Sequence, residues 1–233
     1  MKSEDKIIVA IDTDDLSRAK KLVKNLWPRV KFFKIGLEMI NTGKAPELIK
    51  FIKKLGGKVF YDAKLNDIPN TVAKAVSAIS KLKAEMITVH ASSGSKAMQD
   101  AVKNKGGSKI IGVTVLTSID NPECKSIFGI SVDKKVIQFA DTLLRDGVDG
   151  LVCSVREGRL IRKFKRFTRL NIITPGIRPV WAVSNEQVRT ATPAEAIKAG
   201  ADYLVIGRPI INPPKGMSQG EALGMILKEI NRK

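Results

Sequence analysis

Residues Lys58–Ile68 read KVFYDAKLNDI, a short apolar run that ends in charged residues of alternating sign. Successive side chains of a β-strand point to opposite faces, so Asp62 and Lys64 are expected to share a face where the strand ends. Opposite charges on the inward face of a buried strand cost free energy unless they have partners or a use. The stretch therefore predicts a buried strand with a candidate active site at its carboxyl end.

The same pattern recurs along the chain, where short apolar runs alternate with longer amphipathic stretches. The predicted strands are Ile7–Ile11, Phe32–Ile35, Lys58–Tyr61, Met86–His90, Ile110–Val115, Gly150–Cys153, Asn171–Thr174 and Tyr203–Ile206. The predicted helices include Leu16–Leu26, Ala45–Leu55, Thr71–Leu82, Ser95–Val102, Val136–Leu144, Pro193–Lys198 and Glu221–Ile230. Eight strands, each followed by a helix, predict a (β/α)₈ TIM barrel that forms a single catalytic domain over residues 1–233.

Local signals support these boundaries. Glycines stand where helices are expected to stop, at 56–57, 106–107, 147 and 200. Pro193 after Thr192 is typical of a helix start. The alternative fold is a doubly wound open sheet, but no Gly-x-Gly-x-x-Gly follows the first predicted strand.

Composition limits the kinds of site that the chain can hold. The charged N-terminus leads into only five apolar residues, and no stretch reaches a membrane-spanning length, so we expect a cytoplasmic protein without a membrane partner. Cys124 and Cys153 have neither metal-ligand spacing nor a disulfide framework. With His90 as the single histidine, we expect chemistry without a transition metal.

The formal net charge is +18, which is typical of proteins that bind nucleic acids or anionic small molecules. The lysines are spread over many predicted helices, and aromatic residues make up only 5% of the chain. We therefore expect a lysine-rich solvated surface and no nucleic-acid partner, with a basic nucleic-acid-binding protein as the alternative. A positive field would also attract a phosphorylated, carboxylated substrate.

Polar residues fall where predicted barrel strands end, which is where barrel enzymes place catalytic groups. Asp12 follows the first strand, Lys34 ends the second, and Asp62 and Lys64 end the third, with Asp67 on the loop beyond. A lysine flanked by carboxylates is expected to stay an ammonium group, suited to stabilising a carbanion and giving it a proton. The alternative is a structural ion-pair network at the barrel rim.

A phosphate site is predicted after the seventh and eighth strands. Gly176 and Arg178 follow one, and Gly207 and Arg208 follow the other. Barrels often bind phosphate with these two loops, and an arginine offers a bidentate fork to its oxygens. The alternative is that the glycines only form turns.

The span 179–189 has no strand or helix periodicity and is long for a barrel loop, so it is a candidate lid. Gln187 within it could hydrogen-bond a phosphate or a ring carbonyl, and Trp181 is either a hydrophobic anchor or a substrate contact.

His90 ends the fourth predicted strand. We favour a structural role for it over a general base, because no serine or cysteine partner completes a triad.

The motif Asp62-x-Lys64-x-x-Asp67-Ile68-Pro69-Asn70-Thr71 resembles the signature of the orotidine 5′-phosphate decarboxylase family. Further matches span nearly the whole chain: Val9–Asp12, Lys34–Gly36, Val89–Ser92, Gly112–Ser118, Pro175–Pro179, Gln187–Arg189 and Val205–Ile210. The resemblance implies a carboxy-lyase that converts orotidine 5′-monophosphate (OMP) to uridine 5′-monophosphate (UMP) without a cofactor, the final step of de novo pyrimidine synthesis.

Carried over position by position, the resemblance also implies roles. Lys64 would protonate C6 of the pyrimidine. Asp62 would lie beside the substrate carboxylate. Asp12 and Lys34 would hold the ribose hydroxyls, and Thr117 would hydrogen-bond the pyrimidine ring. The phosphate would be bound by Gln187, Gly207 and Arg208, with Arg178 nearby. In a homodimer, Asp67 and Thr71 would reach the neighbouring subunit's site.

The nearest alternative is a sister group of barrels, the 3-keto-gulonate 6-phosphate decarboxylases and hexulose-phosphate synthases. They share the Asp-x-Lys-x-x-Asp motif but use magnesium, which needs oxygen ligands. Lys34 stands where that chemistry calls for another carboxylate, and its ammonium group would repel Mg²⁺. We therefore expect no metal.

Overall fold

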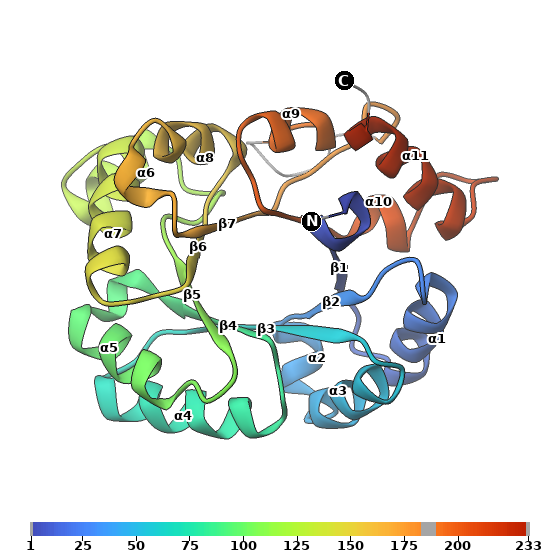
Figure 1. The fold of residues 1–233 in the computed structure, drawn as a ribbon, viewed down its shortest axis with the longest axis horizontal. Helices are drawn as coiled ribbons and strands as arrows, with labels where there is room; N and C mark the ends of the chain where they lie inside the picture. Colours follow the sequence, from blue (N-terminus) through green and yellow to red (C-terminus); the bar gives the residue numbers. More distant parts are fainter. Residues whose placement is uncertain (1, 183–189, 232–233) are drawn as a thin grey trace.

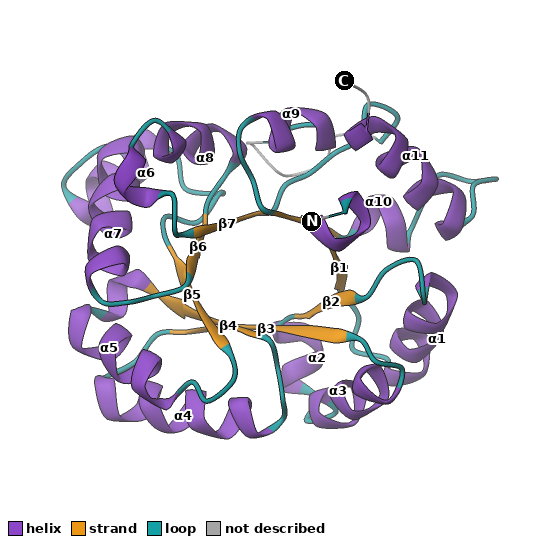
Figure 2. Cartoon of the chain, in the orientation of Figure 1, coloured by secondary structure: helices purple, strands orange, loops and turns teal. Residues whose placement is uncertain are grey.

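The computed structural model describes residues 2–182 and 190–231, which form one closed barrel of parallel strands in the order β1 to β8. Helices surround the strands on the outside (Figures 1 and 2). The strands are β1 (Ile7–Ile11), β2 (Phe32–Ile35), β3 (Lys58–Leu65), β4 (Met86–His90), β5 (Lys109–Val113), β6 (Gly150–Val152), β7 (Asn171–Thr174) and β8 (Tyr203–Ile206). The pairing of β1 with β8 closes the barrel, which confirms the predicted fold.

The helices lie between successive strands, except for α10 and α11, which follow β8, and they pack around the outside of the barrel (Figure 1). The α-helices are α1 (Leu16–Leu26), α2 (Leu37–Asn41), α3 (Ala45–Lys54), α4 (Pro69–Lys81), α5 (Ser95–Asn104), α6 (Asn121–Phe128), α7 (Val132–Arg145), α8 (Val155–Arg162), α9 (Pro193–Lys198), α10 (Arg208–Ile211) and α11 (Gln219–Asn231). The 3₁₀ turns are η1 (Ser3–Lys6), η2 (Ala91–Ser93) and η3 (Lys165–Phe167). Within the described ranges, no helix has both the length and the apolar composition needed to cross a membrane.

Two apolar layers hold the barrel together. Outward-facing strand residues and the inner faces of the helices make one large cluster, which includes Val9, Phe33 and Leu48. Inward-facing residues fill the barrel interior: Ile8, Ala10, Phe32, Phe60, Met86, Ile111, Ile173 and Val205. Because both faces of each strand are covered, the strands read as continuous apolar runs, which is why the sequence revealed them.

The expected strands differ from the observed ones mainly at their ends. Strand β3 was expected to stop at Tyr61 but continues through Leu65, so the charged residues lie within it. Strand β5 starts one residue earlier than expected and ends at Val113, and β6 ends at Val152. The carboxyl ends are hard to predict because the apolar pattern and the strand end at different residues: charged residues interrupt it within β3, while buried Val115 and Cys153 extend it past β5 and β6.

Most helix boundaries follow the local signals, although α7 begins at Val132, four residues before the expected start at Val136. Thr192 caps α9 through a reciprocal capping box with Glu195, and Pro193 occupies the first turn, as predicted. Gly56 and Gly200 both follow helices with positive φ, a conformation that glycine adopts without steric cost. Helices α2, α6, α8 and α10 lie outside the expected set, and they are at most eight residues long.

Candidate active site

The strands change from apolar to polar as they reach the mouth of the barrel. On β1 the inward position passes from Ala10 to Asp12 just after the strand, and on β2 it passes from Phe32 to Lys34. On β3 it passes from Phe60 to Asp62. In the parallel register Lys34 is level with Ala10 and Phe60. Because inward positions recur every second residue, Asp12 and Asp62 lie one inward position closer to the mouth than Lys34, on the strands to either side of it.

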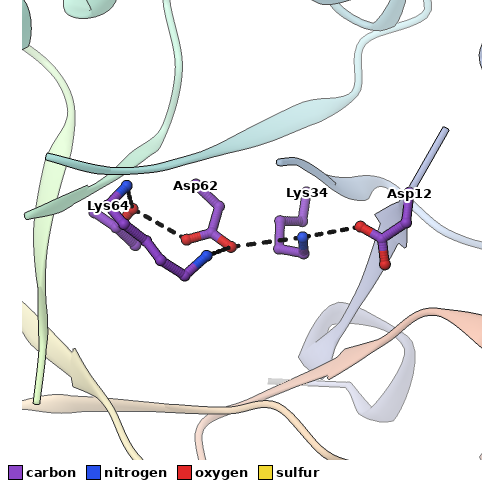
Figure 3. A network of polar contacts seen from close by, with 5 residues as sticks. Asp12, Lys34, Asp62 and Lys64 are labelled. Carbon is purple, nitrogen blue, oxygen red and sulfur yellow. Dashed lines mark hydrogen bonds and ion pairs between the residues drawn. The ribbon is translucent and has the colours of Figure 1, made fainter. Parts of the chain in front are cut away.

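The three strands thereby assemble a row of alternating charges, Asp12, Lys34, Asp62 and Lys64 (Figure 3). Lys34 Nζ lies 3.1 Å from Asp12 Oδ1 and 3.5 Å from Asp62 Oδ2. Lys64 Nζ lies 2.8 Å from the same Asp62 oxygen. Asp62 is only 7% exposed, so water screens its ion pairs weakly. The expectation that Asp62 and Lys64 come together is confirmed.

A backbone irregularity positions Lys64. Between the pairs Tyr61–Ile87 and Leu65–Val89, β3 advances four residues, from 61 to 65, while β4 advances two, from 87 to 89. Lys64 has a φ of 49°, in the left-handed region that costs a residue with a side chain about 1–3 kcal/mol. Simple strand alternation therefore does not explain the contact with Asp62, because a bulge re-aims the lysine.

Mutual ion pairing shifts the pKa values of both buried members of the row. Burial alone would raise the pKa of the Asp62 carboxyl, but the Lys34 and Lys64 ammonium groups and the Thr88 hydroxyl hold it below its usual value. Burial would likewise lower the pKa of Lys34, but Asp62 and Asp12 outweigh it and raise that pKa. Near neutral pH both groups are charged.

The row forms one wall of a cavity of about 260 Å³ at the mouth of the barrel. Its floor is apolar and is made by Ala10, Phe60, Val113, Val152, Ile173 and Val205. Thr117, Gly176, Arg178, Gly207 and Arg208 also line it. In a closed barrel of eight strands β7 lies opposite β3, so Arg178 stands across the cavity from Lys64. The cavity thus combines a charged row, an apolar floor and two arginines, Arg178 after β7 and Arg208 after β8.

The cationic end of the cavity is arranged for an anion. Arg178 is half-buried, and its pKa is lowered by burial and by the positive charge of Arg208. Gly207 allows close approach at this end, since a Cβ there would lie 3.0 Å from Asp12 Oδ2. Two guanidinium groups near each other favour an anionic ligand between them.

Replacing Arg208 with glutamine should lower kcat/KM for a phosphorylated substrate by about 10- to 100-fold, the size expected for losing hydrogen bonds to a charged group. Steady-state kinetics measures this loss. Arg156→Gln is the matched control, because Arg156 is an exposed arginine outside the cavity that pairs with Asp133. Equal kinetics for the two variants would contradict an anion-binding role for Arg208.

Two expected site residues lie outside this cavity in the single chain. Asp67 and Thr71 are exposed, and Asp67 Oδ1 accepts a hydrogen bond from the Ile68 backbone N–H at 2.7 Å. Ile68 between them is 66% exposed. Gln187 lies outside the described residues, as does the span 183–189 of the expected lid. Trp181 packs against the core, as the anchor alternative predicts.

His90 is half-buried at the end of β4 and does not belong to the described cavity lining. Burial and the nearby charge of Lys64 lower its pKa, although Asp62 opposes the shift. A neutral imidazole is therefore favoured near pH 7. This agrees with a supporting position beside the row.

Sequence reasoning missed Thr88, whose side chain is fully buried inside the barrel. Its hydroxyl lies 3.1 Å from Asp62 Oδ1 and accepts a hydrogen bond from the Lys64 backbone N–H at 2.8 Å. The available signal was its place two residues before His90, which puts a polar group on the inward face of a buried strand.

The carboxylates of the row leave little room for a metal ion. Among the described residues, no group of three or more His, Cys, Asp or Glu side chains is arranged to hold one. The ammonium group of Lys34 lies between Asp12 and Asp62, where a bridging cation would have to sit. The donor set therefore does not fit Mg²⁺, which requires several oxygen ligands.

Comparisons with known proteins agree with one another. A family model described as the Orotidine 5′-phosphate decarboxylase / HUMPS family matches residues 5–223. An orotidine 5′-phosphate decarboxylase of Moorella thermoacetica is 41% identical over 234 residues, covering 96% of this chain and 92% of that protein. One of Afipia carboxidovorans is 42% identical over 222 residues, covering 94% and 93%.

Two solved structures share the fold. The crystal structure of orotidine 5′-phosphate decarboxylase from Lactobacillus acidophilus matches with a TM-score of 0.80 at 30% identity, covering 98% of this chain and 100% of that one. An uncharacterized conserved protein from Geobacillus kaustophilus matches with a TM-score of 0.82 at 26% identity, covering 97% and 100%.

Proposed function

The chain belongs to the orotidine 5′-phosphate decarboxylase family, and we propose that its row of alternating charges carries the decarboxylation without a cofactor. The enzyme is a carboxy-lyase that catalyses the last step of UMP biosynthesis, in which OMP loses carbon dioxide and becomes UMP. What remains to be assigned is the part that each residue plays.

The reaction has one difficult intermediate. When the bond between C6 and the carboxylate breaks, its electron pair stays on C6 as carbon dioxide leaves. The resulting sp² carbanion is poorly delocalised by the ring, so the barrier must be lowered by charges that are already in place. Lys64 Nζ then gives its proton to C6, which completes UMP.

The observation that carries this proposal is the position of the Lys64 ammonium group, 2.8 Å from a carboxylate that is only 7% exposed. A donor held by ion pairs in a fixed site needs no reorganisation when negative charge develops. Asp62 would lie beside the substrate carboxylate, and Lys34 and Asp12 would hold the ribose hydroxyls.

The rest of the cavity supports binding of the nucleotide. Arg178, Gly207 and Arg208, which line the cavity, would bind the phosphate together with Gln187. Thr117 would contact the pyrimidine ring above the apolar floor. Binding energy gained at the phosphate, remote from C6, can be used to order the reacting end.

We further propose that the chain, as one catalytic domain over residues 1–233, works as a homodimer in the cytoplasm. Asp67 and Thr71 would contact the ribose in the neighbouring subunit's site. Their exposure and their position outside the cavity of their own chain support this arrangement.

The decisive assay follows the loss of OMP absorbance with purified protein in excess chelator. We expect full conversion to UMP and carbon dioxide at the same rate with and without EDTA, because Lys34 fills the space between the carboxylates. Loss of activity in chelator, restored by Mg²⁺, would overturn the cofactor-free proposal and favour the magnesium-dependent sister chemistry.

A further inference from the structure

The fully buried hydroxyl of Thr88 connects the carboxylate of Asp62 and the backbone of Lys64. A hydroxyl has one proton to donate, and an ionised carboxylate only accepts hydrogen bonds, whereas a backbone N–H only donates them. The proton of Thr88 must therefore point at Asp62 Oδ1, while its lone pair receives the N–H of Lys64. Both interactions have a single possible direction, so the hydroxyl has no alternative orientation that satisfies its neighbours.

The two carboxylate oxygens of Asp62 have different partners. Oδ1 lies 3.1 Å from Thr88 Oγ1, while Oδ2 faces Lys64 Nζ at 2.8 Å and Lys34 Nζ at 3.5 Å. The two oxygens of an ionised carboxylate are equivalent, so a half-turn changes nothing, but a rotation out of the present plane would take both oxygens away from their partners and break the row. Thr88 thus holds the orientation in which one oxygen serves both lysines.

The hydrogen bond to Lys64 acts on the backbone at the bulge. Lys64 has a φ of 49°, and its N–H lies between the two register pairs that flank the bulge. The Thr88 hydroxyl replaces a strand carbonyl as its acceptor, at 2.8 Å. A single side chain on β4 therefore fixes both the backbone from which Lys64 projects and the carboxylate to which its ammonium group binds.

We propose that Thr88 is a positioning residue for the decarboxylation: its hydroxyl fixes Asp62 and Lys64 in the geometry that presents the proton donor to C6. This inference rests on the function proposed above, in which Lys64 is that donor. Thr88 itself does not belong to the described cavity lining, so it acts through its two partners.

Two matched pairs of side chains test the role of the oxygen atom. Thr and Val have the same shape, and Ser and Ala differ only by the hydroxyl. We expect Thr88→Val to lower kcat by about 10- to 100-fold, the size expected for losing a hydrogen bond to a charged group. Thr88→Ser should stay close to wild type, and Thr88→Ala should fall below Thr88→Ser by a similar factor. KM should change little, because the phosphate contacts lie across the cavity.

The pH profile gives a second readout that a purely structural role would not move. Asp62 faces Lys34 from β2, Lys64 from β3, and Thr88 and His90 from β4. The Thr88 hydroxyl bonds the ionised form of Asp62, so its removal should raise the pKa of that carboxyl. The acid limb of kcat/KM should therefore move to higher pH in Thr88→Val and Thr88→Ala, and stay in place in Thr88→Ser.

Binding of UMP, measured by titration calorimetry, reports whether each variant keeps its cavity. The inference is overturned if the hydroxyl-free variants bind UMP and turn over OMP as fast as their hydroxyl-bearing partners, or if Thr88→Ser falls as far as Thr88→Ala. If Thr88→Val does not fold, the Ser and Ala pair decides by the same criteria. Retained activity in the single variant Lys64→Ala, with Thr88 intact, would instead refute the proposed function, whatever the Thr88 variants did.

Discussion

Replacing Lys64 with alanine is expected to lower kcat by about 10⁴-fold or more. A positioned general acid contributes roughly 10²- to 10⁴-fold, and a charge preorganised at a developing anion contributes about another 10²- to 10³-fold. Lys64 supplies both effects if it protonates C6. The measurement is the decrease of OMP absorbance at saturating substrate, with enough enzyme to detect slow turnover.

The variant should keep its fold. Asp62 retains Lys34 and Thr88 as partners, so no carboxylate is left buried and unpaired. Alanine also carries a Cβ, so the exchange adds no strain at the positive φ of this position. Lys58→Ala is the matched control, because Lys58 begins the same strand and is exposed at the opposite end of the barrel. Near-normal turnover by Lys64→Ala would refute the proton-donor role.

The sequence predicted the barrel well because its strands are buried on both faces and read as apolar runs. It predicted the end of β3 poorly for a related reason. Asp62 and Lys64 look like the start of a loop, although they continue the strand through a bulge. A lysine at positive φ has no sequence signal, since lysine does not favour that conformation.

Charge spacing alone left the row open to two interpretations, a catalytic array or a structural ion-pair network. The structure shows that the row lines a cavity that also has an apolar floor and two arginines, which a purely structural network would not require. Thr88 escaped prediction because threonine is an ordinary residue in a strand. Its role depends on what β3 places beside it, which β4 alone does not reveal.

Mixing two inactive variants is expected to restore activity if the sites are shared across a dimer. Asp67→Ala and Lys64→Ala should each be strongly impaired alone. In a mixed dimer, one site combines the intact Lys64 of one subunit with the intact Asp67 of the other. The second site carries both defects. Random pairing of equal amounts makes half of the dimers mixed, so about a quarter of all sites should have wild-type composition in a symmetric dimer.

The exposure of Asp67 motivates this experiment. Its carboxylate accepts a bond from the Ile68 backbone and lies outside the cavity that holds Asp62 and Lys64. If Asp67 acted within its own chain, every site in a mixed dimer would carry one defect, and no activity would return. The two variants must be unfolded and refolded together, or coexpressed, so that subunits exchange. Gel filtration would confirm that the species assayed is a dimer.

Mixing the double variant Lys64→Ala/Asp67→Ala with an equal amount of wild type also distinguishes sites shared across the dimer from sites within one chain. Here the readout is a loss of activity instead of a gain. In a shared-site dimer each mixed pair has no functional site, because the wild-type subunit's Lys64 lacks its partner's Asp67. Only wild-type homodimers remain active, so activity should fall to about half of the wild-type activity added. With sites contained in single chains, the double variant would leave that activity unchanged. Site sharing requires both a gain of activity in the first mixture and a loss in the second. A gain without the loss would therefore contradict it.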